Sequence, residues 1–203
     1  MDDRIVEEAA VEDHTAERLE LLRLARQTIA AYVTTGDTTP YETNDPWLQR
    51  LAAVFVTLRV RPVAGQVALP GEEQGELRGC IGQVEAELPL YLAVQSAAVK
   101  AATVDPRFYP VQPEELDTLL IEISILSAMR PVRDLDDIAI GRDGLLISGS
   151  GRRGLLLPEV PVHFDWDQAE FVRNLCHKAG LPTDAWPARA RLYAFTTDSF
   201  EES

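Results

Sequence analysis

The residues best suited to chemistry lie together in the segment 77–82, whose sequence is LRGCIG. A cysteine becomes a nucleophile or a redox thiol when a nearby cation stabilises its thiolate, and Arg78 stands two positions before Cys80. Because side chains alternate between the faces of a strand, we expect Arg78 and Cys80 on one face. Gly79 and Gly82 are typical of places where a ligand or another backbone comes close. The segment predicts either an approachable Arg–Cys face or a core strand whose glycines pack on a helix around an inert cysteine.

Three further polar residues, Asp105, Arg107 and Glu122, stand in otherwise apolar, structure-forming segments. With Arg78 and Cys80 they form our candidate site, because two arginines at one cleft suit a carboxylate or a phosphate group. The structural alternative is that Arg78 and Arg107 form salt bridges with Glu122 and Asp105. Such bridges would fasten a helix and a loop to the sheet, since partly buried charges are usually paired.

Cysteine catalysis is the second functional hypothesis, with Cys80 as the nucleophile or redox thiol. A catalytic cysteine also needs a base, and the three histidines, His14, His163 and His177, are all distant from it in the sequence. Cys176 falls on the apolar face of a predicted helix, so we expect it in the core. Measuring thiol reactivity across pH separates this hypothesis from simple ligand binding.

The sequence predicts no metal site and no cofactor. A metal would need several Cys, His or carboxylate side chains at ligand spacing, and the adjacent Cys176 and His177 point in different directions on a helix. Two glycine-containing stretches, 141–144 and 149–151, lack the P-loop lysine and the Rossmann spacing. We interpret both stretches as turns.

The composition indicates a globular protein of the cytoplasm. Of the 203 residues, 46% are hydrophobic, and 33 acidic against 19 basic side chains give a net charge of −14. This charge repels phosphate backbones and disfavours nucleic-acid binding. No apolar run approaches a membrane span, no signal-peptide pattern opens the chain, and the two cysteines make no disulfide framework. We therefore expect neither nucleic acid nor membrane as a partner.

Periodicity and turn residues predict the order of helices and strands. Apolar residues recur at helical spacing between Thr15 and Gly36, and residues 1–16 read as an acidic tail or helical extension before a domain of residues 17–203. The other predicted elements are strand 53–58, a strand 77–82 that pairs with it across a long loop, a helix from Pro89, strand 119–126 with Glu122 and Ser124 on one face, an Asp143-Gly144 hairpin between residues 138–140 and 145–147, a helix capped by Asp165 or Asp167, and a final strand 191–197.

Hairpin signals outnumber helical crossovers in this order of elements. The predicted fold class is therefore α+β, with a mainly antiparallel sheet flanked by helices and a smaller lobe. We expect the sheet to be continuous.

Several motifs in register resemble the AMMECR domain family, called AmmeMemoRadiSam system protein A in prokaryotes. The resemblance runs from about residue 17 to the end of the chain. Besides segment 77–82, the motifs that carry it are Ala101-Ala102, Asp105-Pro106-Arg107-Phe108, Pro110-Val111, Glu114-Glu115-Leu116, residues 120–126, residues 140–145, residues 155–160, and Lys178-Ala179-Gly180-Leu181-Pro182 ahead of Trp186.

The resemblance implies an α+β fold with a cleft and names no reaction. Its site positions fall on Arg78, Gly79, Cys80, Gly82, Asp105, Arg107 and Glu122. It further implies a protein that holds a small anionic ligand or a partner peptide in this cleft. The same resemblance implies that the protein acts beside a Memo-like protein and a radical SAM enzyme.

Overall fold

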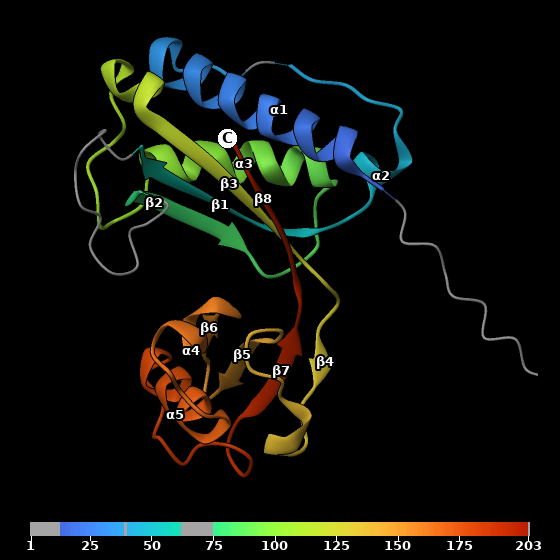
Figure 1. The fold of residues 1–203 in the computed structure, drawn as a ribbon, viewed down its shortest axis with the longest axis vertical. Helices are drawn as coiled ribbons and strands as arrows, with labels where there is room; N and C mark the ends of the chain where they lie inside the picture. Colours follow the sequence, from blue (N-terminus) through green and yellow to red (C-terminus); the bar gives the residue numbers. More distant parts are fainter. Residues whose placement is uncertain (1–12, 39, 62–74, 203) are drawn as a thin grey trace, which may run out of the picture.

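The computed structural model describes residues 13–38, 40–61 and 75–202, which fold into a large and a small lobe (Figure 1). Each lobe has its own four-stranded antiparallel sheet. The large lobe, with strand order β2-β1-β3-β8, contains α1 (Thr15–Thr35), α2 (Pro46–Gln49), β1 (Ala53–Val60), β2 (Glu76–Gln83), α3 (Leu90–Thr103), the 3-10 helix η1 (Pro113–Thr118), β3 (Leu119–Leu126) and β8 (Thr197–Glu201).

The small lobe is formed by the stretch of chain between β3 and β8. Its strand order is β4-β7-β5-β6, and the aspartate at position 167 caps its longest helix together with Glu170, as expected for a capping box. The elements of this lobe are β4 (Arg130–Pro131), the 3-10 helix η2 (Leu135–Asp137), β5 (Gly144–Gly149), β6 (Arg152–Leu156), α4 (Glu159–His163), α5 (Gln168–Lys178) and β7 (Arg191–Phe195).

The large sheet buries one face, and no described helix of its own lobe covers the other. Period-two alternation in β1 and β3 directs apolar side chains toward α1 and α3, and these side chains form one core with both helices. On the buried face lie Val54, Val56, Leu58, Ile121, Ile123 and Ile125. The opposite face carries Phe55, Thr57, Arg59, Glu122 and Ser124, as the alternation in strand 119–126 predicts.

The small sheet follows the same plan. Leu145 and Ile147 of β5 pack against α5, where Phe171 and Leu175 are fully buried. The predicted inward position of Cys176 is confirmed, since this cysteine is fully buried in the same core. The side chains that alternate with these core residues, Leu146 and Ser148, line a cavity together with Val84 and Glu85 of the large lobe. The uncovered face of the small sheet therefore borders the large lobe.

The predicted fold class is confirmed, but the expected continuous sheet is divided in two. The chain leaves the large sheet at Ser127 and returns to it at Thr196, and these residues meet side by side. The Ser127 N–H donates to the Thr196 carbonyl and the Thr196 N–H donates to Ser127 Oγ, both at 2.9 Å. Because a side chain replaces a backbone acceptor here, the strand ladder stops, and the expected strand 191–197 becomes β7 and β8.

The hairpin expected at Asp143-Gly144 is wrong. Residues 138–140 form no strand, because buried Asp143 accepts a hydrogen bond from the Ala139 N–H at 2.8 Å and pairs with Arg130. The hairpin instead joins β5 to β6 through the predicted turn at Ser150 and Gly151, whose φ angles are +50° and +72°.

The predicted first helix is confirmed as α1, which ends at Gly36 in the left-handed conformation typical of a helix C-terminus. Residues 1–12, most of the predicted acidic tail, lie outside the described residues. None of the helices in the described part of the chain combines the length and apolar character that crossing a membrane requires.

Candidate functional site

A cavity of about 550 Å³ lies between the uncovered face of the large sheet and the edge of the small lobe formed by β6, α4 and the end of α5, and we call it the inter-lobe cleft. Both lobes contribute polar and apolar side chains to it. The large lobe supplies Phe55, Thr57, Arg59, Leu77, Cys80, Arg107 and Glu122, and the small lobe supplies Arg153, Gly154, Leu155, Leu157, Glu159, Val160 and Lys178. Three of the predicted site residues, Cys80, Arg107 and Glu122, therefore meet in one cavity although they are far apart in the sequence.

Arg78 does not line the cleft, so the expected shared face with Cys80 is wrong. The pairing register between β1 and β2 shifts at this point, with Thr57 opposite Cys80 but Arg59 opposite Leu77. Arg78 is the extra residue of this irregularity, and one extra residue reverses the alternation that follows it. As a result Leu77, rather than Arg78, shares the cleft with Cys80.

Arg78 instead fastens η1 and the loop before it to the edge of the sheet. Its guanidinium donates to Glu115 through Nε at 2.8 Å and Nη2 at 3.0 Å, and through Nη1 to the Tyr109 carbonyl at 2.9 Å. The structural alternative predicted that Arg78 forms a salt bridge, and it does, but with Glu115 instead of Glu122. The ion pair lowers the pKa of Glu115.

Other parts of the protein occupy the space that a side chain at either glycine of the segment would need. A side chain at Gly79 would collide with the backbone carbonyl of Ala101 in α3, so this glycine lets the helix approach the strand. A side chain at Gly82 would collide with the ring of Phe55. Neither glycine lines the inter-lobe cleft.

Cys80 presents its thiol to the cleft beside a hydroxyl donor. The Thr57 hydroxyl donates to Cys80 Sγ at 3.2 Å. Burial raises the pKa of the Cys80 thiol, while the Thr57 hydrogen bond and the Arg107 cation oppose that rise without cancelling it. The thiol, rather than the thiolate, is therefore favoured near neutral pH.

Asp105 ties the cleft arginine to the strand that carries Cys80. Its side chain is 2% exposed and accepts hydrogen bonds from the N–H of Cys80 at 2.8 Å and from the Arg107 guanidinium at 2.7 and 3.0 Å. These bonds, led by the one from Arg107, hold the pKa of Asp105 well below its usual range. The salt bridge that the structural alternative proposed for this pair is present, and it also fixes Arg107 at the cleft.

Glu122 and Arg59 face each other in the cleft without close pairing. Arg59 Nε lies 3.8 Å from Glu122 Oε2 and finds no hydrogen-bond partner among the described residues although it is buried. Burial raises the pKa of Glu122, and the Arg59 cation only partly opposes this rise. Both side chains therefore retain capacity to bind another group.

Lys178 lines the cleft and belongs to a motif that carries the family resemblance, but it was not among the predicted site residues. Burial lowers the pKa of Lys178 in the cleft, and the Arg107 cation adds to this lowering, against an opposing effect of Cys80. It makes no ion pair within the described part of the chain. A lysine in the last turn of a helix is ordinary, so its position gave no signal. Arg59, which interrupts an apolar strand, could have been found by the same rule that found Glu122.

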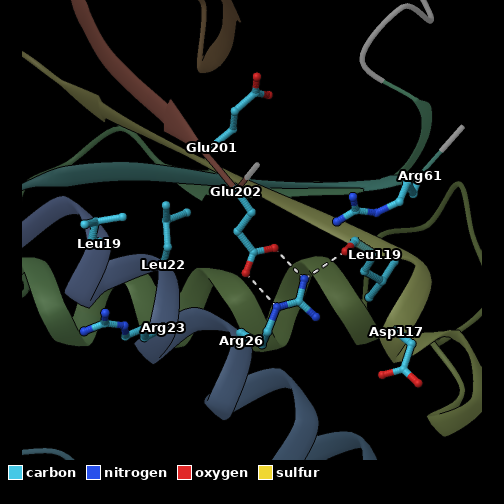
Figure 2. Close-up of a pocket in the computed structure, with 9 residues that line it drawn as sticks. All are labelled: Leu19, Leu22, Arg23, Arg26, Arg61, Asp117, Leu119, Glu201 and Glu202. Carbon is cyan, nitrogen blue, oxygen red and sulfur yellow. Dashed lines mark hydrogen bonds and ion pairs between the residues drawn. The ribbon is translucent and has the colours of Figure 1, made fainter.

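A second cavity of about 400 Å³ lies between α1 and the ends of β3 and β8, and we call it the α1 pocket. Figure 2 shows Arg26 at its centre, reaching from α1 to the Glu202 carboxylate and to the carbonyl of Leu119. Arg26 also donates to the carbonyl of Leu116 at 3.0 Å. Its guanidinium is thus bound to the protein's own acceptors on every side.

The part of the chain that the structure describes contains no group of three or more Cys, His, Asp or Glu side chains placed to hold a metal ion.

Comparison with known proteins gives consistent matches over nearly the whole chain. The family model described as AMMECR1 matches residues 22–200. A Thermococcus gammatolerans protein is 43% identical over 189 residues, which cover 90% of this chain and 88% of that protein. The crystal structure of the uncharacterized protein PH0010 from Pyrococcus horikoshii has a TM-score of 0.81 at 40% identity, covering 91% of this chain and 90% of that chain.

Proposed function

Since the chain belongs to the AMMECR1 family, we propose that it binds a small anionic molecule with an apolar portion in the inter-lobe cleft. The charge of the cleft carries this proposal. Four cations line it, Arg59, Arg107, Arg153 and Lys178, against the two carboxylates of Glu122 and Glu159. The chain as a whole has the opposite balance, with 19 basic and 33 acidic side chains. Arg107 and Arg153 are paired with Asp105 and Glu85, so the charges at the cleft are balanced, whereas the chain as a whole is strongly acidic. This local balance favours an anion in the cleft over the rest of the surface.

The hydrogen-bond donors of the cleft are suited to a carboxylate or a phosphate. Asp105 holds Arg107 in a fixed orientation through two hydrogen bonds, which lowers the entropic cost of presenting it to a ligand. Arg59 Nε is a buried donor without a partner among the described residues, and the Lys178 ammonium group is a further donor at the cleft. Phe55, Leu155 and their apolar neighbours supply a surface for the nonpolar part of the ligand.

Titration calorimetry with hexanoate, with hexanol as its neutral counterpart, tests this proposal. We expect hexanoate to bind and hexanol to bind at least tenfold more weakly. The chain has two lysines, Lys100 and Lys178, so they form a matched pair of variants. Lys178→Ala should weaken hexanoate binding about tenfold, because a charge-assisted contact is lost, and Lys100→Ala should not change it. Equal binding of hexanoate and hexanol, or equal effects of the two variants, would reject the proposal.

A cysteine-dependent activity at Cys80, as nucleophile or redox thiol, is the second candidate function. One observation favours it: the Thr57 hydroxyl donates to Cys80 Sγ inside a cavity that also contains Lys178 and Arg107. The raised pKa of Cys80 weighs against a standing thiolate, so a bound substrate would have to change the cleft's electrostatics.

Native-state labelling with iodoacetamide tests the second candidate, with buried Cys176 as the internal reference. A catalytic Cys80 should react faster than a free cysteine at neutral pH and should slow when Lys178 is replaced by alanine. If Cys80 reacts only at a pH above the ordinary pKa of a free cysteine thiol, the result supports ligand binding without cysteine chemistry.

We also propose that the protein works in the cytoplasm with a Memo-like protein and a radical SAM enzyme. The family resemblance alone supports this partnership. Co-purification of the three proteins expressed together, with and without the change Lys178→Ala, tests whether they associate and whether the cleft takes part. Three separate species in size-exclusion chromatography would count against it.

A further inference from the structure

A third cavity, of about 320 Å³, meets the inter-lobe cleft at Arg153, which lines both. We call it the β7 cavity. It lies on the uncovered face of the small sheet, between Tyr193 of β7 and Glu85 of the large lobe. The two cavities therefore both border the Arg153 side chain between the lobes.

Arg153 is held by an ion pair that a ligand can displace. The pair joins Arg153 of the small lobe to Glu85 of the large lobe, and the two side chains are 59% and 55% exposed. Exposed pairs of this kind contribute little to stability, because water screens them and both side chains lose freedom. An anion in either cavity competes with Glu85 for the same guanidinium.

A row of polar side chains crosses three strands of the small sheet at this point. Ser148 of β5 is paired in register with Arg153 of β6 on one side and with Arg191 of β7 on the other. Directly paired residues share a face, and all three line the β7 cavity. Adjacent strands are about 4.8 Å apart, so the two arginines are separated by about 10 Å along the row with a hydroxyl between them.

Arg191 has no ion-pair partner among the residues that the structure describes, although the row brings two like charges close together. Strands β6 and β7 lie on either side of β5, so the two arginines flank Ser148, and an anion between them would reduce their mutual repulsion. An anionic group above Ser148 would contact both guanidinium groups and the hydroxyl. The row therefore offers donors for an anionic group at a place separate from Arg107 and Lys178.

We propose that the inter-lobe cleft and the β7 cavity together bind one elongated molecule with an anionic group at each end. The first anionic group lies at Arg107 and Lys178, the apolar middle lies along Leu155, and the second anionic group lies on the row of Arg153, Ser148 and Arg191. This inference rests on the proposed function, since it extends the ligand of the same cleft. It assigns that ligand to the class of dianions with an apolar spacer, of which linear dicarboxylates are the simplest probes.

Calorimetric titration with linear dicarboxylates of increasing length, each beside the monocarboxylate of equal length, tests the proposal. We expect the dicarboxylates that reach the row to bind at least tenfold more tightly than their monocarboxylate counterparts. Arg191→Ala should remove this gain and leave monocarboxylate affinity unchanged. Arg173→Ala, which removes an exposed arginine from α5 of the same lobe, should keep the gain. Glu85→Gln should tighten dicarboxylate binding, because Arg153 loses its competing partner.

The outcomes separate this inference from the proposed function. Monocarboxylate binding that depends on Lys178, with no gain from the second carboxylate, would overturn the inference and leave the proposed function standing. A gain that survives Arg191→Ala would likewise overturn it. Absence of binding by every carboxylate would overturn both. Since Arg191 is exposed, its replacement leaves the core unchanged, and an unaltered thermal unfolding midpoint verifies that the variant is folded.

Discussion

The α1 pocket and the inter-lobe cleft are built from the same types of side chain and use them differently. In the α1 pocket, Arg26 donates to both oxygens of Glu202 and to two backbone carbonyls (Figure 2). In the cleft, Arg59 Nε stays 3.8 Å from Glu122. Charges whose hydrogen bonds are completed by the protein itself stabilise the fold. Charges whose hydrogen bonds are left incomplete in a cavity are available to a ligand.

The same difference appears in the pKa values of the carboxylates. Asp105, which is fully hydrogen-bonded, has a strongly lowered pKa, whereas burial raises the pKa of loosely paired Glu122. Hydrogen bonds to the charged form favour ionisation, and burial without them disfavours it. The direction of the pKa shift therefore differs between the hydrogen-bonded carboxylate of Asp105 and the loosely paired carboxylate of Glu122 in the cleft. The following predictions test this distinction.

Arg26→Ala should have the largest effect on stability. It leaves Glu202 and two carbonyls without their donor, which costs about 2 to 3 kcal/mol of unfolding free energy. Urea unfolding followed by circular dichroism measures the loss. Arg23→Ala, one turn earlier on α1, removes an arginine that is 71% exposed and should cost less than about 0.5 kcal/mol. Reduced hexanoate affinity in the Arg26→Ala variant would break the comparison, because the α1 pocket would then communicate with the cleft.

Asp105→Asn should cost about 2 kcal/mol at pH 7, since the N–H of Cys80 and the half-exposed Arg107 lose a charged acceptor. Folding lowers the pKa of Asp105. Its ionised side chain therefore stabilises the fold fully at a pH above the pKa of an aspartate in the unfolded chain, about 4. This stabilisation is lost as the pH falls from there through the lowered pKa of the folded protein. Unfolding free energies measured from about pH 2 to about pH 7 should therefore rise less steeply for the variant than for the native protein. The exposed Asp117→Asn variant should keep the native slope.

Anion affinity in the cleft should fall as the pH rises. Protonated Glu122 and protonated Lys178 favour an anion, and the raised pKa of Glu122 and the lowered pKa of Lys178 bring both proton losses toward neutral pH. We expect a total loss of about tenfold in hexanoate affinity between about pH 5 and about pH 10. Lys178→Arg should remove the part of the decrease in hexanoate affinity that occurs at higher pH. Glu122→Gln should remove the part that occurs at lower pH. A pH-independent affinity would show that neither group faces the ligand.

Glu122→Gln should have the smallest effect on stability. Ionised Glu122 gains little from Arg59 and is disfavoured by burial, so the change should alter the unfolding free energy by no more than about 0.5 kcal/mol at pH 7. Because the pKa is raised in the folded protein, native stability declines as the pH rises through that pKa, and the variant should lack this decline. A loss as large as that of Arg26→Ala would show that Glu122 fastens the fold.

Sequence periodicity predicted most of the fold and only part of the site. Alternation placed Glu122 on the correct face of β3, and helical spacing placed Cys176 in the core, because both depend on regular elements. It failed at Arg78, where a register shift inserts one residue that no periodicity reveals. It also passed over Lys178, whose role depends on how the two lobes meet.

The misplaced hairpin has a similar physical cause. Asp-Gly is typical of a tight turn, but Arg130 and the Ala139 N–H take the Asp143 carboxylate into the core of the small lobe. A partner that is distant in the sequence overrides the local preference. Contacts of this kind are visible only once the fold is known.

The connection through Ser127 and Thr196 has a consequence for the order in which the protein assembles. The small lobe is an insertion between β3 and β8, so a ribosome must complete it before the last strand of the large sheet emerges. Arg26 and its partner Glu202 are 176 positions apart, and the first helix therefore gains its strongest polar contact only from the end of the chain. Such long-range closure slows folding. The small lobe, with its own buried core, has the opportunity to fold while the large one is still incomplete.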